Sequence, residues 1–230
     1  MAKPDGKRKH RKGPSLEVIL LYAFLIVLAI LFVLPIFYLF MGSFKAESEL
    51  FRTPFKWLPD KFRLDNFVNM FSSIPFFKYL KNTMIIVICN IVGSLLSCSL
   101  VAYGFSRLRW PGRDKVFILV LITMILPYQV TLVPLFLMFT KMKWIGTFLP
   151  LTVTCFFGNP FFIFLLRQFF TGIPQDISEA ARIDGAGEFT IFSKLVIPMA
   201  KPALTTVAIF AFIRSWNDFL GPLVFLGKDE

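Results

Sequence analysis

Charged side chains that could take part in chemistry gather in one short segment of an otherwise apolar chain. Residues 171–200 hold four acids, Asp176, Glu179, Asp184 and Glu188, against two bases, Arg182 and Lys194. The small side chains of Ala180 and Ala181 lie among them. Carboxylates and a guanidinium group beside small residues suit ion pairs and hydrogen bonds with a second protein. The pattern therefore predicts a docking surface.

A second polar group lies near the carboxyl end, inside an apolar stretch. It consists of Arg214, Asn217 and Asp218, with Trp216 between them. On one continuous helix Arg214 and Asp218 would be a turn apart, so an ion pair is expected. Polar side chains inside an apolar span either line an aqueous path or lock the helix to its neighbours. Gln129, near two prolines in another apolar stretch, is a further candidate for such a path or marks a kink.

The chain shows no pattern typical of an enzyme. The sole histidine, His10, lies in a basic tail, and no glycine-rich phosphate loop is present. Cys89, Cys98 and Cys155 fall inside apolar stretches without the spacing of metal ligands, so we interpret them as small packing residues. We therefore expect neither catalysis nor a bound metal ion.

The elements that must position these groups are membrane-spanning helices. Hydrophobic residues make up 56% of the chain, which has 30 Phe and a mean hydropathy of +0.69. Crossing a hydrocarbon core of about 30 Å takes roughly 20 apolar residues as a helix. Five stretches qualify, at about 17–41, 80–105, 116–139, 147–170 and 202–226. The sequence therefore predicts an all-α integral membrane protein, a polytopic helical bundle.

Basic residues near the span ends predict the orientation in the membrane. Six Lys or Arg lie in residues 1–14, and four lie in the short connection 106–115. Because such residues resist translocation, we expect a cytoplasmic amino-terminal tail and a multi-pass protein of the plasma membrane. The same distribution assigns the net charge of +11 to contacts with lipid headgroups rather than with nucleic acid.

The segment 171–201 would then join the last two spans on the cytoplasmic side. Pro174 suits a first helical turn, and Asp176 favours the positive end of a helix dipole. Glycines at 185 and 187 allow the backbone to reverse. We expect a short helix, a glycine turn and a second short helix over about 188–194.

The first of these helices would present a shallow face to a partner. Helical spacing places four residues on one side, namely Ile177, Ala180, Ala181 and Asp184. Glu179 and Arg182 can pair with each other or reach across to the partner. The alternative is an amphipathic helix that lies on lipid headgroups, but such helices are usually basic. The acidic composition favours a protein partner.

The string EAARIDGAGEFTIFSKLVIP resembles the EAA loop of the inner-membrane permease subunits of binding-protein-dependent ABC importers. The matching residues are Glu179, Ala180, Ala181, Gly185 and Pro198, with the Asp184-Gly185-Ala186 variant of the sugar branch. Two further stretches are similar to carbohydrate permeases of the maltose and glycerol-phosphate type. They are the string from Ser215 to Leu223, and Tyr103 to Arg107 at the end of the second span.

The resemblance implies a type I ABC importer permease with a coupling helix at the EAA loop. Such a subunit works with a second homologous permease, two ATP-binding subunits and an extracytoplasmic sugar-binding protein. ATP and magnesium would be bound by the partner, so this chain would need no cofactor. Family members have six spans, and we interpret these residues as lacking the sixth.

The resemblance also suggests roles for residues outside the loop. The candidate translocation path for a carbohydrate comprises Asn217, Asp218, Trp216, Gln129 and Arg214, with Trp216 either stacking on a sugar or anchoring at the interface. The loop 42–81, which contains Pro54, Phe55 and Trp57, is either part of the binding-protein surface or a packed cap. Alternative functions are an ion-coupled secondary carrier and a transport-inactive membrane scaffold.

Overall fold

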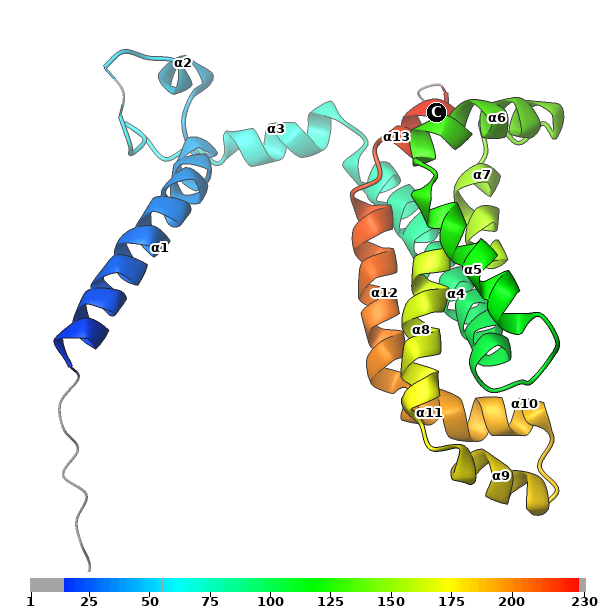
Figure 1. Cartoon of the computed structure of the whole chain (residues 1–230). Helices are drawn as coiled ribbons and strands as arrows, with labels where there is room; N and C mark the ends of the chain where they lie inside the picture. Colours follow the sequence, from blue (N-terminus) through cyan, green and yellow to red (C-terminus); the bar gives the residue numbers. More distant parts are fainter. Residues whose placement is uncertain (1–14, 55, 228–230) are drawn as a thin grey trace, which may run out of the picture. The chain divides into compact units, whose positions relative to one another are not determined.

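The computed structural model describes residues 15–54 and 56–227, which form helices and loops without strands (Figure 1). The basic tail 1–14, His10 and Phe55 lie outside the described residues. The chain divides into two compact units, Met1–Phe76 and Phe77–Glu230.

The first unit consists of one long apolar helix and a folded loop. Helix α1 (Leu16–Gly42) has a mean hydropathy of 3.1 and buries none of its residues, so its apolar surface is available to lipid. The short helices α2 (Glu47–Leu50) and α3 (Asp65–Ser73) follow it.

The loop of the first unit is organised around the buried side chain of Lys45. Its ammonium group donates to the carbonyl oxygen of Lys56 at 2.5 Å and lies over the ring of Tyr38. The amide of Asn66 donates to the carbonyls of Ser43 and Lys45 at 2.9 and 2.8 Å. The loop is therefore packed on itself.

The second unit is a helical bundle built on the long helix α4 (Phe76–Ser106). Helix α5 (Arg113–Ile122) and the 3₁₀ turn η1 (Thr123–Ile125) follow, and α8 (Pro160–Gly172) and α12 (Lys201–Trp216) pack beside them (Figure 1). The core between these helices contains small residues of α4 and α12, such as Ala102 and Val207, against aromatic residues such as Phe162. Small side chains let helix backbones approach closely, which drives helix association in lipid.

Three of the predicted spans, the third, the fourth and the last, are broken in the structure. The third is bent by 96° between Arg113–Ile125 and α6 (Tyr128–Lys141). Pro127 causes this break, because proline has no amide proton to donate and forces the preceding Leu126 to an extended ψ of 115°. The predicted kink is confirmed at Pro127, whereas Pro134 lies within α6.

The fourth predicted span is interrupted in the way that Asn159 and Pro160 suggest. Helix α7 (Leu149–Thr152) and the 3₁₀ turn η2 (Val153–Phe157) end at Gly158, whose φ is +86°. Asn159 then caps α8, its side-chain oxygen accepting from two amide groups of the first turn. Since the break satisfies its own backbone groups, it is tolerated inside an apolar span.

The last predicted span ends earlier than expected. Helix α12 stops at Trp216, and a separate helix α13 (Leu220–Phe225) follows it. Counting each bent pair of helices as one, the described residues contain up to five candidate spans. In the second unit, α9 and α10 lie at one end of the bundle and α6 and α13 at the other (Figure 1); we call these the α9 end and the α13 end.

Candidate functional site

The expected helix after Pro174 is present as α9 (Gln175–Ile183). Asp176 lies in its first turn and Arg182 in its last, so both charges complement the helix dipole. The helix ends at Gly185, whose φ of +83° is a conformation that only glycine adopts without strain. The amide of Ala186 then donates to the carbonyl of Ala181 at 2.9 Å, which closes the turn.

The side of α9 that faces outward differs from the prediction. Ser178 is buried, and Ile177 and Ala181 pack against the core of the bundle. The exposed apolar side chains are Ile183 at the end of α9 and Phe189 after the turn, which are 86% and 74% exposed. The predicted face is therefore wrong for Ile177 and Ala181, because the bundle itself covers that side.

Glu179, Ala180 and Asp184 remain exposed and share the outward side of α9 with Ile183. An apolar patch with a carboxylate on each flank, on a helix end that no other described residue covers, has the form of a helix that docks in a groove.

The second arm of the loop is one helical run from Glu188 to Met199, longer than the predicted 188–194. It comprises α10 (Glu188–Thr190), the π-helical segment η3 (Ile191–Val196) and α11 (Ile197–Met199). Ile191, Phe192 and Val196 bury their side chains in the bundle core. Pro198 follows the π-helical segment, and the run then bends by 79° into α12. Proline has no amide proton to donate, which suits a position just after a change of helix type.

The carboxylate of Glu188 ties this arm to two other elements. One oxygen accepts from the hydroxyl of Tyr103 at 2.6 Å, and the other accepts from Nε of Arg182 at 2.7 Å. Hydrogen bonds from Arg182 and Tyr103 hold the pKa of the Glu188 carboxyl below its ordinary value. Arg182 therefore forms its ion pair with Glu188, six residues later, and not with Glu179.

Arg107 joins the same end of α4 to the start of the loop. Its side chain is buried and donates from Nη2 to the carbonyl of Ile173 at 2.8 Å and from Nη1 to that of Pro174 at 3.5 Å. These two residues lead directly into α9. Burial lowers the pKa of the Arg107 guanidinium, which nevertheless remains charged at physiological pH.

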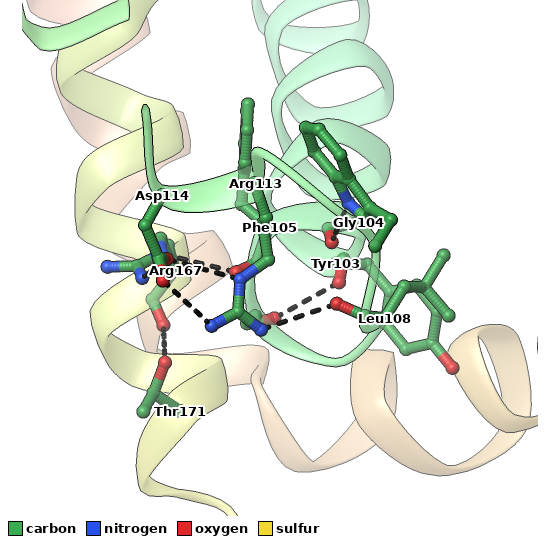
Figure 2. Close-up of polar contacts among 10 residues, drawn as sticks. Tyr103, Gly104, Phe105, Leu108, Arg113, Asp114, Arg167 and Thr171 are labelled. Carbon is green, nitrogen blue, oxygen red and sulfur yellow. Dashed lines mark hydrogen bonds and ion pairs between the residues drawn. The ribbon is translucent and has the colours of Figure 1, made fainter. Parts of the chain in front are cut away.

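The turn between α4 and α5 is fixed by a third arginine, on α8 (Figure 2). Arg167 donates from Nε to the carbonyl of Phe105 at 3.3 Å and from Nη2 to Asp114 at 3.2 Å. Its guanidinium also lies 4.1 Å from the ring centroid of Phe117, a cation–π contact. Arg113 donates from Nε to the same oxygen of Asp114, also at 3.2 Å. The end of α4 is consequently held against α5 and α8.

A hollow of about 320 Å³ opens between α9 and this turn. Glu179, Arg182 and Glu188 line one side, and Arg107 and Arg109 line the other. No group of His, Cys, Asp and Glu side chains within residues 15–54 and 56–227 is arranged to hold a metal ion. The charged side chains on both sides of the hollow give this end the character of a recognition surface.

The polar residues at the α13 end do not form the expected ion pair. Because α12 ends at Trp216, Arg214 and Asp218 do not share a helix, and no salt bridge joins them. The Asp218 carboxylate instead accepts from the amide of Gly221 at 3.0 Å and caps the start of α13. The side-chain amide of Asn217 donates to the carbonyl of Ile213 at 2.8 Å and caps the end of α12. The prediction of an Arg214–Asp218 pair is wrong.

The remaining candidates of the path also lie at helix breaks. Gln129 is exposed in the first turn of α6. The neighbouring Tyr128 lies close enough to Asp218 and Arg214 to interact electrostatically with both. Trp216 is 45% exposed and stacks on Phe212 at 5.5 Å between ring centroids. The breaks of the third and fifth predicted spans therefore come together at the α13 end.

Sequence reasoning missed the roles of three side chains at the α9 end. Tyr103 and Arg107 stand one helical turn apart at the end of a span, on the same side of α4. Arg167 stands inside a predicted span, where an unpaired charge would be costly. A tyrosine and two arginines so placed in an apolar chain are the signal that could have identified them.

Residues 90–229 match the family described as "Binding-protein-dependent transport system inner membrane component". The chain belongs to this family. It is a permease subunit, a polytopic all-helical membrane component of an importer. The loop that contains α9, the turn between α4 and α5 and the broken last span all lie within the matched residues.

Similar proteins include permeases of several carbohydrate importers. The diacetylchitobiose uptake system permease protein NgcG of Streptomyces coelicolor is 34% identical over 210 residues, which cover 91% of this chain and 69% of that protein. The arabinooligosaccharides transport system permease protein AraQ of Bacillus subtilis is 34% identical over 225 residues, covering 96% of this chain and 80% of AraQ.

A solved structure shares the fold. It is a chain from the crystal structure of a bacterial ABC transporter involved in the import of the acidic polysaccharide alginate. The TM-score is 0.83 at 26% sequence identity, and the match covers 98% of this chain and 78% of that chain.

Proposed function

We propose that this chain is one of two related permease subunits of an ATP-driven carbohydrate importer. In this proposal α9 docks on a cytoplasmic ATP-binding subunit, which closes and opens as ATP is bound and hydrolysed. ATP and magnesium belong to that partner, and this chain transmits its movement to the spans. A conformational change of this kind needs an element that makes different contacts in two states.

The observation that carries the proposal is the outward side of α9. Ile183 and Phe189 present apolar surface on both sides of the Gly185 turn, while Glu179 supplies a charge beside them. Exposed apolar side chains rimmed by polar residues are typical of protein interaction sites. Family membership favours ATP-driven transport over an ion-coupled carrier, since the family serves binding-protein-dependent systems.

The orientation follows from the same assignment. A cytoplasmic α9 places the amino-terminal tail on the cytoplasmic side and the α13 end toward the outside, in agreement with the basic residues at Arg107, Arg109 and Arg113. The extracytoplasmic sugar-binding protein then meets the outer side of the complex. In this proposal the loop 42–81, in which the side chain of Trp57 is 49% exposed, supplies part of its docking surface.

We propose a carbohydrate as substrate, because the similar permeases are named for diacetylchitobiose and for arabinooligosaccharides. The helix breaks at the α13 end supply polar groups suited to a sugar, namely Asn217, Asp218, Trp216, Gln129 and Arg214. Hydroxyl groups of a sugar bind amides and carboxylates, and its apolar face stacks on an indole ring.

The coupling role is tested by a matched pair of glycine variants in the complete importer. Gly185→Ala strains the turn after α9 because of its positive φ, whereas Gly187→Ala is at φ −73° with no atom within 4 Å of the added methyl group. We expect Gly185→Ala to reduce sugar uptake by vesicles at least tenfold, with normal membrane insertion, and Gly187→Ala to retain uptake. Full uptake by Gly185→Ala would contradict the coupling role. An assembled wild-type complex without uptake would indicate the scaffold function.

A further inference from the structure

The last turn of α4 contacts both arms of the loop that contains α9. Tyr103 reaches Glu188 at the start of the second arm, and Arg107 reaches the carbonyls of Ile173 and Pro174 before the first. Tyr103 lies in the last turn of α4, and Arg107 directly follows that helix, with its amide bonded to the Tyr103 carbonyl one turn earlier. A single turn of a long span therefore holds the docking helix at both of its ends.

The Glu188 carboxylate is the point where three helices meet. Its two oxygens accept one bond from α4 and one from the last turn of α9, while its own backbone begins α10. The bonds of 2.6 and 2.7 Å are short for their types, as expected when the acceptor is ionised. The Gly185 turn is thus closed into a compact unit that is joined to α4.

The two ends of this connection differ in burial. Tyr103 is 5% exposed, and its ring packs edge-to-face on Phe192 at 5.2 Å between centroids. The side chains of Arg182 and Glu188 are 39% and 44% exposed. The anchor on α4 is therefore fixed by packing, while the groups on the loop face solvent and follow α9 when it moves.

The backbone joins α9 to α8 through Ile173 and to α12 through the 188–199 run, and neither connection can be broken by a side-chain change. A connection to α4 is made by side chains, through the bonds from Tyr103 to Glu188 and from Arg182 to Glu188. These bonds, unlike the backbone, can form and break during a transport cycle.

We propose that Tyr103 is a positioning residue that transmits the movement of α9 to α4 through Glu188 and Arg182, with Arg107 as the fixed support beside it. The proposal rests on the proposed function, since it specifies how a docked α9 acts on the spans. α4 moves with α9 while the bonds are intact and moves less when they are removed.

The test uses the complete importer in proteoliposomes and measures sugar uptake and ATP hydrolysis in the same preparation. Tyr103→Phe removes the hydroxyl and leaves the packed ring, and Glu188→Gln removes the charge that accepts both bonds. Tyr79→Phe is the control, because Tyr79 is on the same helix, is 46% exposed and lies in the first turn of α4, at the end of the helix away from Tyr103. A purely structural contact would alter protein yield and thermal stability but not the number of sugars carried per ATP.

We expect Tyr103→Phe and Glu188→Gln each to lower the ratio of sugar uptake to ATP hydrolysis at least threefold, and Tyr79→Phe to leave it unchanged. The ratio of the double variant Tyr103→Phe with Glu188→Gln should be no lower than that of Glu188→Gln alone, because the two changes break one shared hydrogen bond. An unchanged ratio in Tyr103→Phe, or effects of the two changes that multiply in the double variant, would overturn the inference.

The same samples separate this inference from the proposed function. Ile183→Cys is introduced into the wild-type chain and into each variant, and its thiol is cross-linked to the ATP-binding subunit. A cross-link that forms while the Tyr103→Phe ratio equals that of wild type refutes the inference and leaves the docking of α9 intact. Absence of the cross-link in the otherwise wild-type complex refutes the proposed function itself.

Discussion

The hydroxyl of Tyr103 donates a 2.6 Å hydrogen bond to the carboxylate of Glu188, 85 residues further along the chain. This bond joins a span of the bundle to the loop that carries the exposed helix α9. Together with the bonds from Arg107 to the carbonyls of Ile173 and Pro174, it determines how α9 is held. In the proposed function, these hydrogen bonds connect α9 to the spans.

Arg107→Ala should destabilise the bundle, since it leaves the carbonyl of Ile173 without its guanidinium donor. A buried acceptor that loses its partner costs about 1–3 kcal/mol. Arg109→Ala is the matched control, because Arg109 is exposed and makes a single contact of 3.5 Å to Gln175. Unfolding of the purified subunit in detergent, followed by helical circular dichroism, measures both. Equal stability of the two variants would show that the Arg107 bonds contribute little.

Acidification should weaken the connection at Glu188. Its pKa in the folded chain is below the ordinary value of 4.5, so its stabilising effect is complete above that pH and is lost as the pH falls through the lowered pKa. Glu188→Gln cannot titrate and should lack this part of the pH dependence. The measurement compares the melting temperatures of wild type and Glu188→Gln from neutral pH to below 4.5. Parallel curves for the two proteins would contradict the assignment.

Gly93→Ala should disturb the contact between α4 and η2. A methyl group at Gly93 would overlap the sulfur of Cys155 and come within 3.0 Å of the Phe156 ring. Overpacking of this kind costs about 1–3 kcal/mol.

The control for Gly93 is on the same helix. Gly104→Ala meets no atom within 4 Å, so it should be neutral or stabilising by up to about 1 kcal/mol. Thermal stability in detergent measures both variants. A Gly93→Ala protein as stable as Gly104→Ala would show that α4 and η2 are less closely packed than described.

Exchange of charge between Arg214 and Asp218 should give no rescue. The two side chains form no ion pair, and Asp218 instead caps α13 through Gly221. The double variant Arg214→Glu with Asp218→Arg should therefore be impaired by about the sum of the single effects, with a coupling energy below about 0.5 kcal/mol. Stability and sugar uptake of the four proteins provide the cycle. Recovery of stability or sugar uptake in the double variant would show that the two side chains do form an ion pair.

Long apolar stretches made much of the fold predictable. α1 and α4 run over two of the predicted spans, because about 20 consecutive apolar residues leave a helix as the structure that satisfies its own backbone in lipid. Local chemistry also predicted the start of α9 after Pro174 and the turn at Gly185. The end of α12 at Trp216 was not predictable from hydropathy, because the residues after the break are equally apolar.

The outward side of α9 could not be derived from helical spacing. Spacing identifies that Ile177 and Ala181 share a side, but contacts with distant segments decide whether that side faces the bundle. The same limit applies to Tyr103 and Glu188, whose bond depends on how α4 and the loop pack. Tertiary packing therefore determines which of the predicted polar groups act together.

The docking of α9 on an ATP-binding subunit is the central claim, and site-specific photo-cross-linking tests it most directly. A photoreactive side chain is placed either at Ile183, which is 86% exposed, or at Ile177, which packs against the core on the other side of the same helix. The assembled importer is then irradiated and its products identified. The account predicts capture of the ATP-binding subunit at Ile183 and none at Ile177. Equal capture at both positions, or capture at Ile177 alone, would contradict it.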